Sequence, residues 1–138
     1  MSEIEYPDRD ILEWWVTYLQ ESGDINLSLP EINDFWYEQS LGVIERTKFS
    51  YVNESLHDKA AEIFYNVIKA HNLFDGNKRT GILLVYLFYL INGYYIIGKL
   101  DVRRRAKDVA RSKGRIRHDE WIRKLSIAFS KCTKTFVD

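Results

Sequence analysis

The sequence predicts an all-α protein in which several helices surround one buried central helix, with at most a short β-hairpin. Three observations favour this fold. The chain has 138 residues, enough for a single domain over residues 1–138 with one sizeable core. Most of the chain repeats its apolar residues at the helical period of about 3.6 residues. One run, ILLVYLFYLI at residues 82–91, is apolar on every side, as is typical of a helix at the centre of a fold.

The first half of the chain is expected to contain two helices and a short extended segment. An amphipathic helix is predicted over residues 7–22, stopped by the glycine that follows it. Residues 23–32 are rich in Gly, Asp, Asn, Ser and Pro, which is typical of a loop. A shorter helix over residues 31–41 is expected to end at Gly42. Residues 47–53 alternate in a way that indicates a strand or one arm of a hairpin.

The second half is expected to contain four helices. Residues 55–70 carry a strong apolar stripe on one face. The apolar helix is predicted over residues 77–91, and it is too short to span a bilayer, which takes ~20 apolar residues. Two amphipathic helices are predicted over residues 101–112 and 118–130, separated by a turn at Gly114.

Charge is balanced overall but divided along the chain. Residues 1–62 carry a net charge of −10 and residues 99–138 a net charge of +8, while the whole chain is neutral. The neutrality argues against a protein that coats nucleic acid by bulk electrostatics. The asymmetry has two interpretations. The two ends pair across one core, or the basic end forms a face for a phosphate-bearing ligand or an acidic protein partner.

The cysteine count and the N-terminus favour a cytoplasmic protein. Cys132 is the only cysteine, so the chain has no disulfide framework, which suits a reducing compartment. The first ten residues, MSEIEYPDRD, are acidic and lack the apolar stretch of a signal peptide. We therefore expect neither secretion nor membrane insertion.

A cluster of polar residues stands directly before the apolar helix. The stretch HNLFDGNKRTGIL begins at residue 71. Lys78 and Arg79 fall in the first helical turn, where the helix dipole favours acids. Gly76 allows the backbone N–H groups at the helix start to converge as an anion-binding nest. A phosphate resting on this nest would resolve the unfavourable placement of the two bases. The absence of a G-x-x-x-x-G-K-[ST] pattern and of a preceding strand excludes a Walker loop.

Two further side chains fit a phosphate site. A carboxylate at Asp75 would repel phosphates unless a cation lay between them, and Mg²⁺ is commonly held by one carboxylate plus phosphate oxygens. His71 could take a proton from an attacking hydroxyl. Taken singly, each residue has an ordinary interpretation, as a helix cap, a turn or a solvated base. Their combination in this order is much more specific.

The motif resembles the signature of the Fic/Doc proteins, in which a histidine leads H-x-F-x-[DE]-G-N-x-R in a small, compact, all-helical fold. His71, Asp75, Gly76, Asn77 and Arg79 match this pattern, and the resemblance extends over about residues 55–97. It implies roles for each position. His71 would be the general base toward a Ser, Thr or Tyr hydroxyl of a target protein, and Asp75 would be the Mg²⁺ ligand. The anion nest for an ATP phosphate would consist of Gly76, Asn77 and Lys78. The remaining phosphates would be bound by Arg79. A hairpin flap that pins the target segment would correspond to residues 47–53.

Departures from the pattern favour the Doc branch of the family. The adenylylating branch reads G-N-G-R-x-x-R, whereas this chain has Lys78 in place of the second glycine and Ile82 in place of the second arginine. Leu73 replaces the usual phenylalanine, a change that affects core packing. The Doc branch consists of short toxins that act as protein kinases and transfer the γ-phosphate of ATP. Two alternatives stay open, a Fic-type adenylyltransferase and a module that binds phosphate or nucleotide without catalysis.

The same resemblance implies an inhibitory partner. The family is held inactive by an [ST]-x-x-x-E-[GN] helix, in the same chain or in a separate antitoxin. Residues 17–22 and 50–55 match only two positions of this pattern. We therefore expect a separate antitoxin, received by the exposed part of an aromatic set around Trp14, Trp15 and Trp36 or by the basic C-terminal face.

Overall fold

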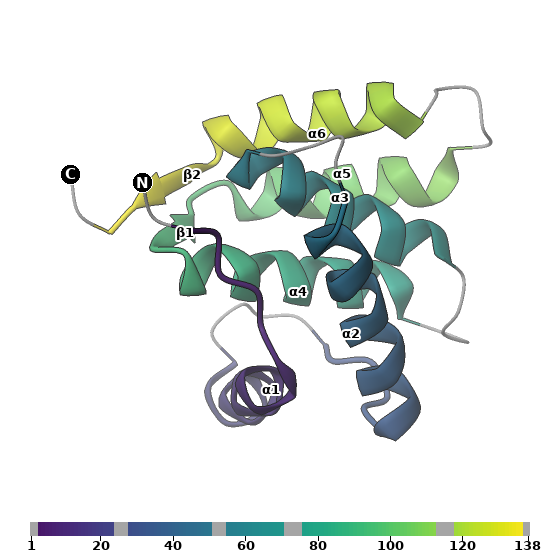
Figure 1. The fold of residues 1–138 in the computed structure, drawn as a ribbon, viewed down its shortest axis with the longest axis vertical. Helices are drawn as coiled ribbons and strands as arrows, with labels where there is room; N and C mark the ends of the chain where they lie inside the picture. Colours follow the sequence, from purple (N-terminus) through teal and green to yellow (C-terminus); the bar gives the residue numbers. More distant parts are fainter. Residues whose placement is uncertain (1–2, 24–27, 51–54, 71–75, 113–117, 137–138) are drawn as a thin grey trace.

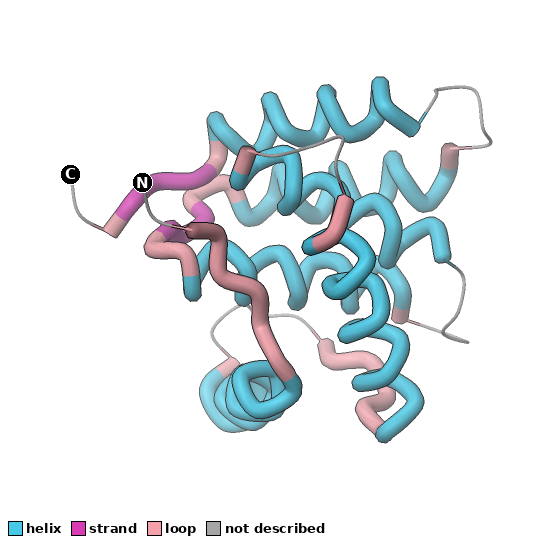
Figure 2. Tube along the Cα trace, viewed as in Figure 1, coloured by secondary structure: helices cyan, strands magenta, loops and turns pink. Residues whose placement is uncertain are grey.

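A computed structural model describes residues 3–23, 28–50, 55–70, 76–112 and 118–136. Within these ranges the fold is almost wholly helical, with one small two-stranded sheet (Figures 1 and 2). The predicted all-α class is confirmed. The elements, in chain order, are α1 (Arg9–Ser22), α2 (Asp34–Lys48), α3 (Leu56–Ala70), α4 (Asn77–Ile91), β1 (Tyr94–Ile96), α5 (Lys99–Arg111), α6 (His118–Lys131) and β2 (Thr133–Thr135).

The apolar helix α4 lies at the centre of the core, as predicted, and its bounds are those expected from the sequence. Nine of its fifteen residues are buried. Its largest contact is with α3, and α5 and β1 also pack against it. The α3–α4 contact is close at Gly81, where an added Cβ would lie 2.8 Å from Cγ1 of Ile68. The site before α4 is therefore carried by the most buried helix of the fold.

Helix α1 begins and ends by ordinary capping. The Asp8 carboxylate accepts a hydrogen bond from the backbone N–H of Ile11 at 2.9 Å. Gly23 ends the helix in the left-handed conformation, with φ of 66°. The predicted end of this helix is confirmed.

The prediction that Gly42 ends the second helix is wrong, because α2 continues to Lys48. A glycine inside a helix costs about 1 kcal/mol, and burial of Val43 and Ile44 beyond it outweighs that cost. The helix ends instead where the buried Lys59 ammonium donates to two carbonyls. These belong to Thr47, at 2.9 Å, and Ser50, at 2.8 Å.

The strand predicted over residues 47–53 is also wrong in its described part. Thr47 and Lys48 are helical, and Phe49 caps the helix. The buried Thr47 hydroxyl donates to the Val43 carbonyl at 2.9 Å, a contact within one helical turn. Residues 51–53 lie outside the described residues.

The observed sheet joins segments far apart in the sequence. β1 and β2 pair antiparallel, with Tyr95 opposite Lys134. The last two helices begin and end within two residues of their predicted bounds, and Gly114 lies outside the described residues. Cys132 is buried between α6 and β2, and burial raises the pKa of its thiol to about 11.

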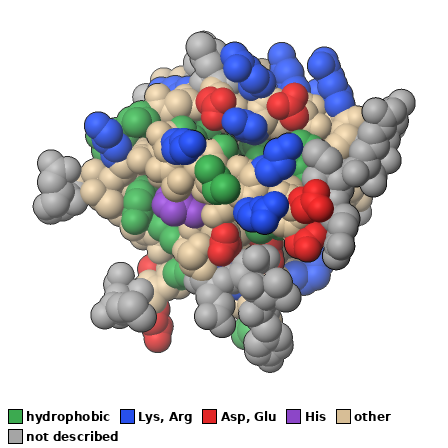
Figure 3. Space-filling view, turned by 90° about the horizontal axis from the view of Figure 1, so that it is seen from above, with side chains coloured by type: hydrophobic (Ala, Val, Ile, Leu, Met, Phe, Trp, Pro, Cys, Tyr) green, Lys and Arg blue, Asp and Glu red, His purple; other side chains and the backbone are tan. Residues whose placement is uncertain are grey.

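Three ion pairs of the described residues lie within the two charged regions. Among the described residues, Arg9 pairs with Glu13 and Asp34 inside the acidic region, and Arg105 pairs with Asp101 inside the basic region. None of these pairs joins the two regions, so they do not support pairing of the two ends across the core. Figure 3 shows the molecule from above, where Lys and Arg side chains stand among Asp and Glu side chains. In the described ranges, no helix has the length and apolarity needed to cross a membrane.

Candidate functional site

The N-cap residue of α4 gives the backbone donors of the first turn no side-chain cap. Gly76 is the N-cap residue, in the left-handed conformation with φ of 100°. It has no side chain that could accept from the N–H groups after it, and the first N–H groups of a helix have no partner within the helix. Donors of this kind, together with the positive end of a helix dipole, are features that favour an anion. His71 and Asp75 lie outside the described residues, so their predicted roles stay predictions.

Close packing also leaves no space for a side chain at Gly76. A Cβ built on Gly76 would lie only 2.6 Å from Cβ of Pro30, in the segment between α1 and α2. Pro30 is buried. Any larger residue at this position would therefore meet both an unfavourable φ and the Pro30 ring.

Arg79 lies beside the same glycine. Its Nη1 donates to the Ser28 hydroxyl at 3.0 Å and to the Leu29 carbonyl at 3.4 Å. Its Nη2 lies 3.5 Å from the place that a Cβ on Gly76 would occupy. One arm of the guanidinium thus contacts the α1–α2 segment and the other lies next to the helix start, while Lys78 is exposed.

A buried hydrogen bond fixes the first turn of α4 to α2. The indole Nε1 of Trp36 donates to the Thr80 hydroxyl at 2.9 Å, and both residues are fully buried. Asn33 caps α2 by accepting from the Trp36 backbone N–H at 2.9 Å. The sequence placed Trp36 in a short helix and in an aromatic set for a partner, so this buried contact was not predicted.

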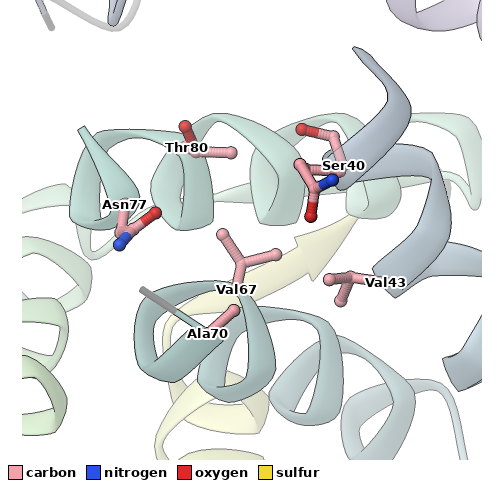
Figure 4. A pocket seen from close by; sticks show the side chains of 7 residues that line it. Ser40, Val43, Val67, Ala70, Asn77 and Thr80 are labelled. Carbon is pink, nitrogen blue, oxygen red and sulfur yellow. The ribbon is translucent and has the colours of Figure 1, made fainter. Parts of the chain in front are cut away.

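A narrow crevice lies between α2, α3 and α4, beside the helix start. Figure 4 shows side chains from the three helices around it. Its volume of about 10 Å³ is roughly the room that one water molecule needs. The Ser40 hydroxyl, in a side chain only 2 % exposed, has no hydrogen-bond partner among the described residues, and such a group is expected to bind an ordered water. The residues lining the crevice are Gln39, Ser40, Val43, Val67, Ala70, Asn77 and Thr80.

A larger polar pocket opens on the other side of the end of α3. Its volume is about 480 Å³, within the usual range for small-ligand sites. Ala70, which directly precedes the motif, lines both this pocket and the crevice. Glu62 accepts from the Ser50 hydroxyl at 3.1 Å, and Lys69 donates to the Ser112 carbonyl. The lining residues are Arg46, Ser50, Glu62, Asn66, Lys69, Ala70 and His118.

Comparison with known protein families identifies the family of this chain. The model of the Fic/DOC family matches residues 20–89, just over half of the chain. The chain belongs to the Fic/DOC family. No curated protein and no solved structure matched it. Members of this family are generally transferases that use nucleotide substrates, so the chain is a Fic-type module of this general class.

The Fic/DOC match covers the elements that build the site. It runs from the end of α1 through the Ser28–Pro30 segment and α2 to most of α4. It includes all residues of the crevice and all of the polar pocket except His118. No local pattern in the sequence points to the polar pocket, because its residues come from α2, α3, α6 and the segment after α2, and lie up to 72 positions apart.

The described part of the Fic/DOC site contains no ready-made metal cluster. In the described ranges, no group of three or more His, Cys, Asp or Glu side chains is arranged to hold an ion. Mg²⁺ does not require such a group, because it is usually bound by one or two carboxylates together with substrate phosphates and water. Asp75 is adjacent in sequence to the helix start at Gly76, which fits this mode of binding.

Proposed function

We propose that this Fic/DOC protein is a kinase of the Doc type, which transfers the γ-phosphate of ATP to a Ser, Thr or Tyr hydroxyl of a target protein. The observation that carries this proposal is Ile82. It occupies the position of the second arginine of the adenylylating pattern, and it is buried, with 5 % of its surface exposed. The first turn of α4 therefore holds only Arg79 and Lys78 as cations for phosphates.

The phosphate next to the acceptor is proposed to lie on the N–H groups of Gly76, Asn77 and Lys78. Arg79 would bind the other phosphates of the same nucleotide, since an arginine fork suits phosphate oxygens. The Nη2 position beside Gly76 supports this assignment. Lys78, which is exposed, would add charge near the same phosphates.

The nucleoside part of ATP is proposed to occupy the polar pocket. That pocket is large enough for an adenosine and begins at Ala70, one residue before His71. Asn66 and His118, whose side chains lie 3.3 Å apart, offer hydrogen-bonding groups to a base or a ribose.

His71 is proposed as the general base. It would take the proton of the target hydroxyl, whose oxygen forms the new bond to the γ-phosphorus. The bond from that phosphorus to the β,γ-bridging oxygen breaks, and ADP leaves with the electron pair. Asp75 and phosphate oxygens would hold Mg²⁺, which neutralises charge on the phosphates. The chain's own contribution is to position the phosphates and to remove the proton.

A separate antitoxin is proposed as the inhibitory partner. The aromatic surface available to it is smaller than expected, because Trp15 and Trp36 are buried and only Trp14, 53 % exposed, remains accessible. Tyr18 stacks on Trp14 at a ring distance of 5.7 Å. Expression of the chain alone should arrest growth, and co-expression of its antitoxin should relieve the arrest. Normal growth with the chain expressed alone would argue against a toxin.

Labelled ATP distinguishes the proposal from its alternatives. The protein is incubated with cell extract and with ATP labelled either at the α- or at the γ-phosphorus, with His71→Ala as the matched control. Label on protein from the γ-position alone supports the kinase. Label from the α-position identifies an adenylyltransferase instead. Binding of ATP with no transfer from either position identifies a non-catalytic nucleotide-binding module.

A further inference from the structure

We infer that Ser28 is a positioning residue, which with the Leu29 carbonyl aims the Arg79 guanidinium at the nucleotide phosphates. This inference rests on the proposed function, because it concerns how the phosphate site is held ready. It adds the segment between α1 and α2 to a site that the sequence placed wholly in residues 71–79.

The contacts assign different tasks to the two ends of the guanidinium. Nη1 donates to the Ser28 hydroxyl at 3.0 Å and to the Leu29 carbonyl at 3.4 Å. Nη2 lies 3.5 Å from the place that a Cβ on Gly76 would occupy. The α1–α2 segment therefore holds Nη1, and Nη2 lies beside the residue that precedes α4.

The acceptors in this segment suit an orienting role. The Ser28 hydroxyl and the Leu29 carbonyl are neutral, so they orient the guanidinium without cancelling its charge. An arginine side chain has about 2 kcal/mol of rotamer entropy, and fixing it in advance lowers the cost of binding a phosphate. A carboxylate in the same place would compete with the phosphate for the guanidinium.

The segment and the helix start are also joined by packing. Pro30 fills the space beside Gly76, so that even one added carbon would overlap it. A few residues later, the Trp36 indole holds the Thr80 hydroxyl of the same helical turn. The Ser28–Pro30 segment therefore has a fixed position relative to the nest, as an orienting contact requires.

The contribution of Ser28 to folding should be small. Its side chain is exposed, and an exposed hydrogen bond adds little to the free energy of unfolding. Ser130 provides a matched control, because it is also an exposed serine and its hydroxyl donates only to Ile127 in its own helix.

The test measures binding and turnover of ATP with Mg²⁺ for the parent protein, Ser28→Ala, Ser28→Thr, Ser130→Ala and Arg79→Ala. We expect Ser28→Ala to raise the Kd and KM for ATP about 3- to 10-fold, the effect of weakening one hydrogen bond to a charged group. Its melting temperature and kcat should stay close to those of the parent. Ser28→Thr, which keeps the hydroxyl, should restore the affinity, and Ser130→Ala should bind as the parent does.

The outcomes separate the two proposals. Equal ATP affinity of the parent and Ser28→Ala, with Arg79→Ala impaired, overturns the positioning role and leaves the proposed function standing. A fall in the melting temperature of Ser28→Ala that accounts for its lost affinity also overturns the positioning role. If the parent itself binds no ATP, or if Arg79→Ala binds as tightly as the parent, the proposed function fails and this inference fails with it.

Discussion

The two ends of α4 are built in opposite ways. At its C-terminal end, the Asn92 side chain donates to the Phe88 carbonyl at 2.8 Å and to the Glu5 carbonyl at 2.9 Å, and accepts from the Glu5 N–H at 2.8 Å. The N–H of Gly93 bonds to the Leu90 carbonyl at 3.1 Å. At the N-terminal end, Gly76 supplies no side-chain cap. Among the described residues, side-chain hydrogen bonds thus complete the C-terminal end of α4, whereas the N-cap residue at its N-terminal end contributes none.

We therefore expect the C-terminal end of α4 to contribute mainly to stability and its N-terminal end mainly to ligand binding. The C-terminal end carries bonds that hold the N-terminal segment to the core. The N-terminal end carries Lys78 and Arg79, whose charge opposes the helix dipole. Unfavourable placement of this kind is expected where a ligand completes the structure. Substitutions at the two ends should therefore affect different measurements.

The largest effect is expected at the N-terminal end from His71→Ala. Loss of a general base should lower the rate of transfer about 10²- to 10⁴-fold and should abolish growth inhibition. The proposed role as a base predicts a thermal melt that matches that of the parent. Enzyme assay and melt are measured on the same preparation. A His71→Ala protein as active as the parent would show that another group takes the proton.

A matched pair of glycine substitutions compares the two ends directly. Gly76 and Gly93 both have positive φ, at 100° and 85°, so alanine at either costs about 1–2 kcal/mol of backbone strain. Only at Gly76 would the new Cβ meet another residue, Pro30, which adds about 1–3 kcal/mol of overpacking. Gly76→Ala should therefore be the less stable variant in chemical denaturation, and it alone should weaken ATP binding. Equal losses of stability would show that the Pro30 contact adjusts easily.

Asn92→Ala should lower stability without changing nucleotide affinity. The substitution removes three side-chain hydrogen bonds, and we expect a loss of about 1–2 kcal/mol in the free energy of unfolding. Urea denaturation measures this loss, and titration with ATP checks that the Kd is unchanged. Weaker ATP binding by Asn92→Ala would mean that the two ends of α4 are coupled.

The smallest effect is a pH dependence near the C-terminal end. His57 lies 2.8 Å, Nδ1 to hydroxyl, from Tyr89 of α4, and burial lowers the pKa of its imidazole below 6.5, with Asp58 opposing the shift. Between the two pKa values the unfolded chain binds more protons than the folded one. The contribution of His57 is therefore present above pH 6.5 and is lost as the pH falls below it. NMR titration of the ring should give the lowered pKa, and a value above 6.5 would contradict this sign.

The sequence predicted the bounds of an element correctly where neighbouring residues carry the signal. The bounds of α4 followed from a polar motif placed directly before an all-apolar run, and Gly23 marked the end of α1. The sequence-based prediction was wrong at Gly42, where burial of the following residues outweighed the helix-breaking preference of glycine. β1 and β2 were missed because three-residue strands carry almost no periodicity and pair across 39 positions.

In the candidate site, too, the sequence predicted residues that are close together in the chain but not contacts between distant segments. The motif indicated Gly76 and Arg79 because they are neighbours in sequence. Ser28 is 51 positions from Arg79, and Trp36 is 44 positions from Thr80. Contacts of this range depend on how α1 and α2 pack against α4, which no single stretch of sequence encodes.

The C-terminal end of α4 is also where both described ends of the chain are attached. The N–H of Glu5 bonds to Asn92, and the N–H of Phe136 bonds to the Gly93 carbonyl at 2.9 Å; the two ends lie on the same side in Figure 1. The N-cap of α4 is Gly76 and its C-cap is Asn92, so this point is about 24 Å from Gly76 along the helix axis. A tether at either end would hold the protein with its nest facing away from the support. A pulling force applied between the ends would load these few hydrogen bonds first, and they would break in succession before the core and the nest bore any tension.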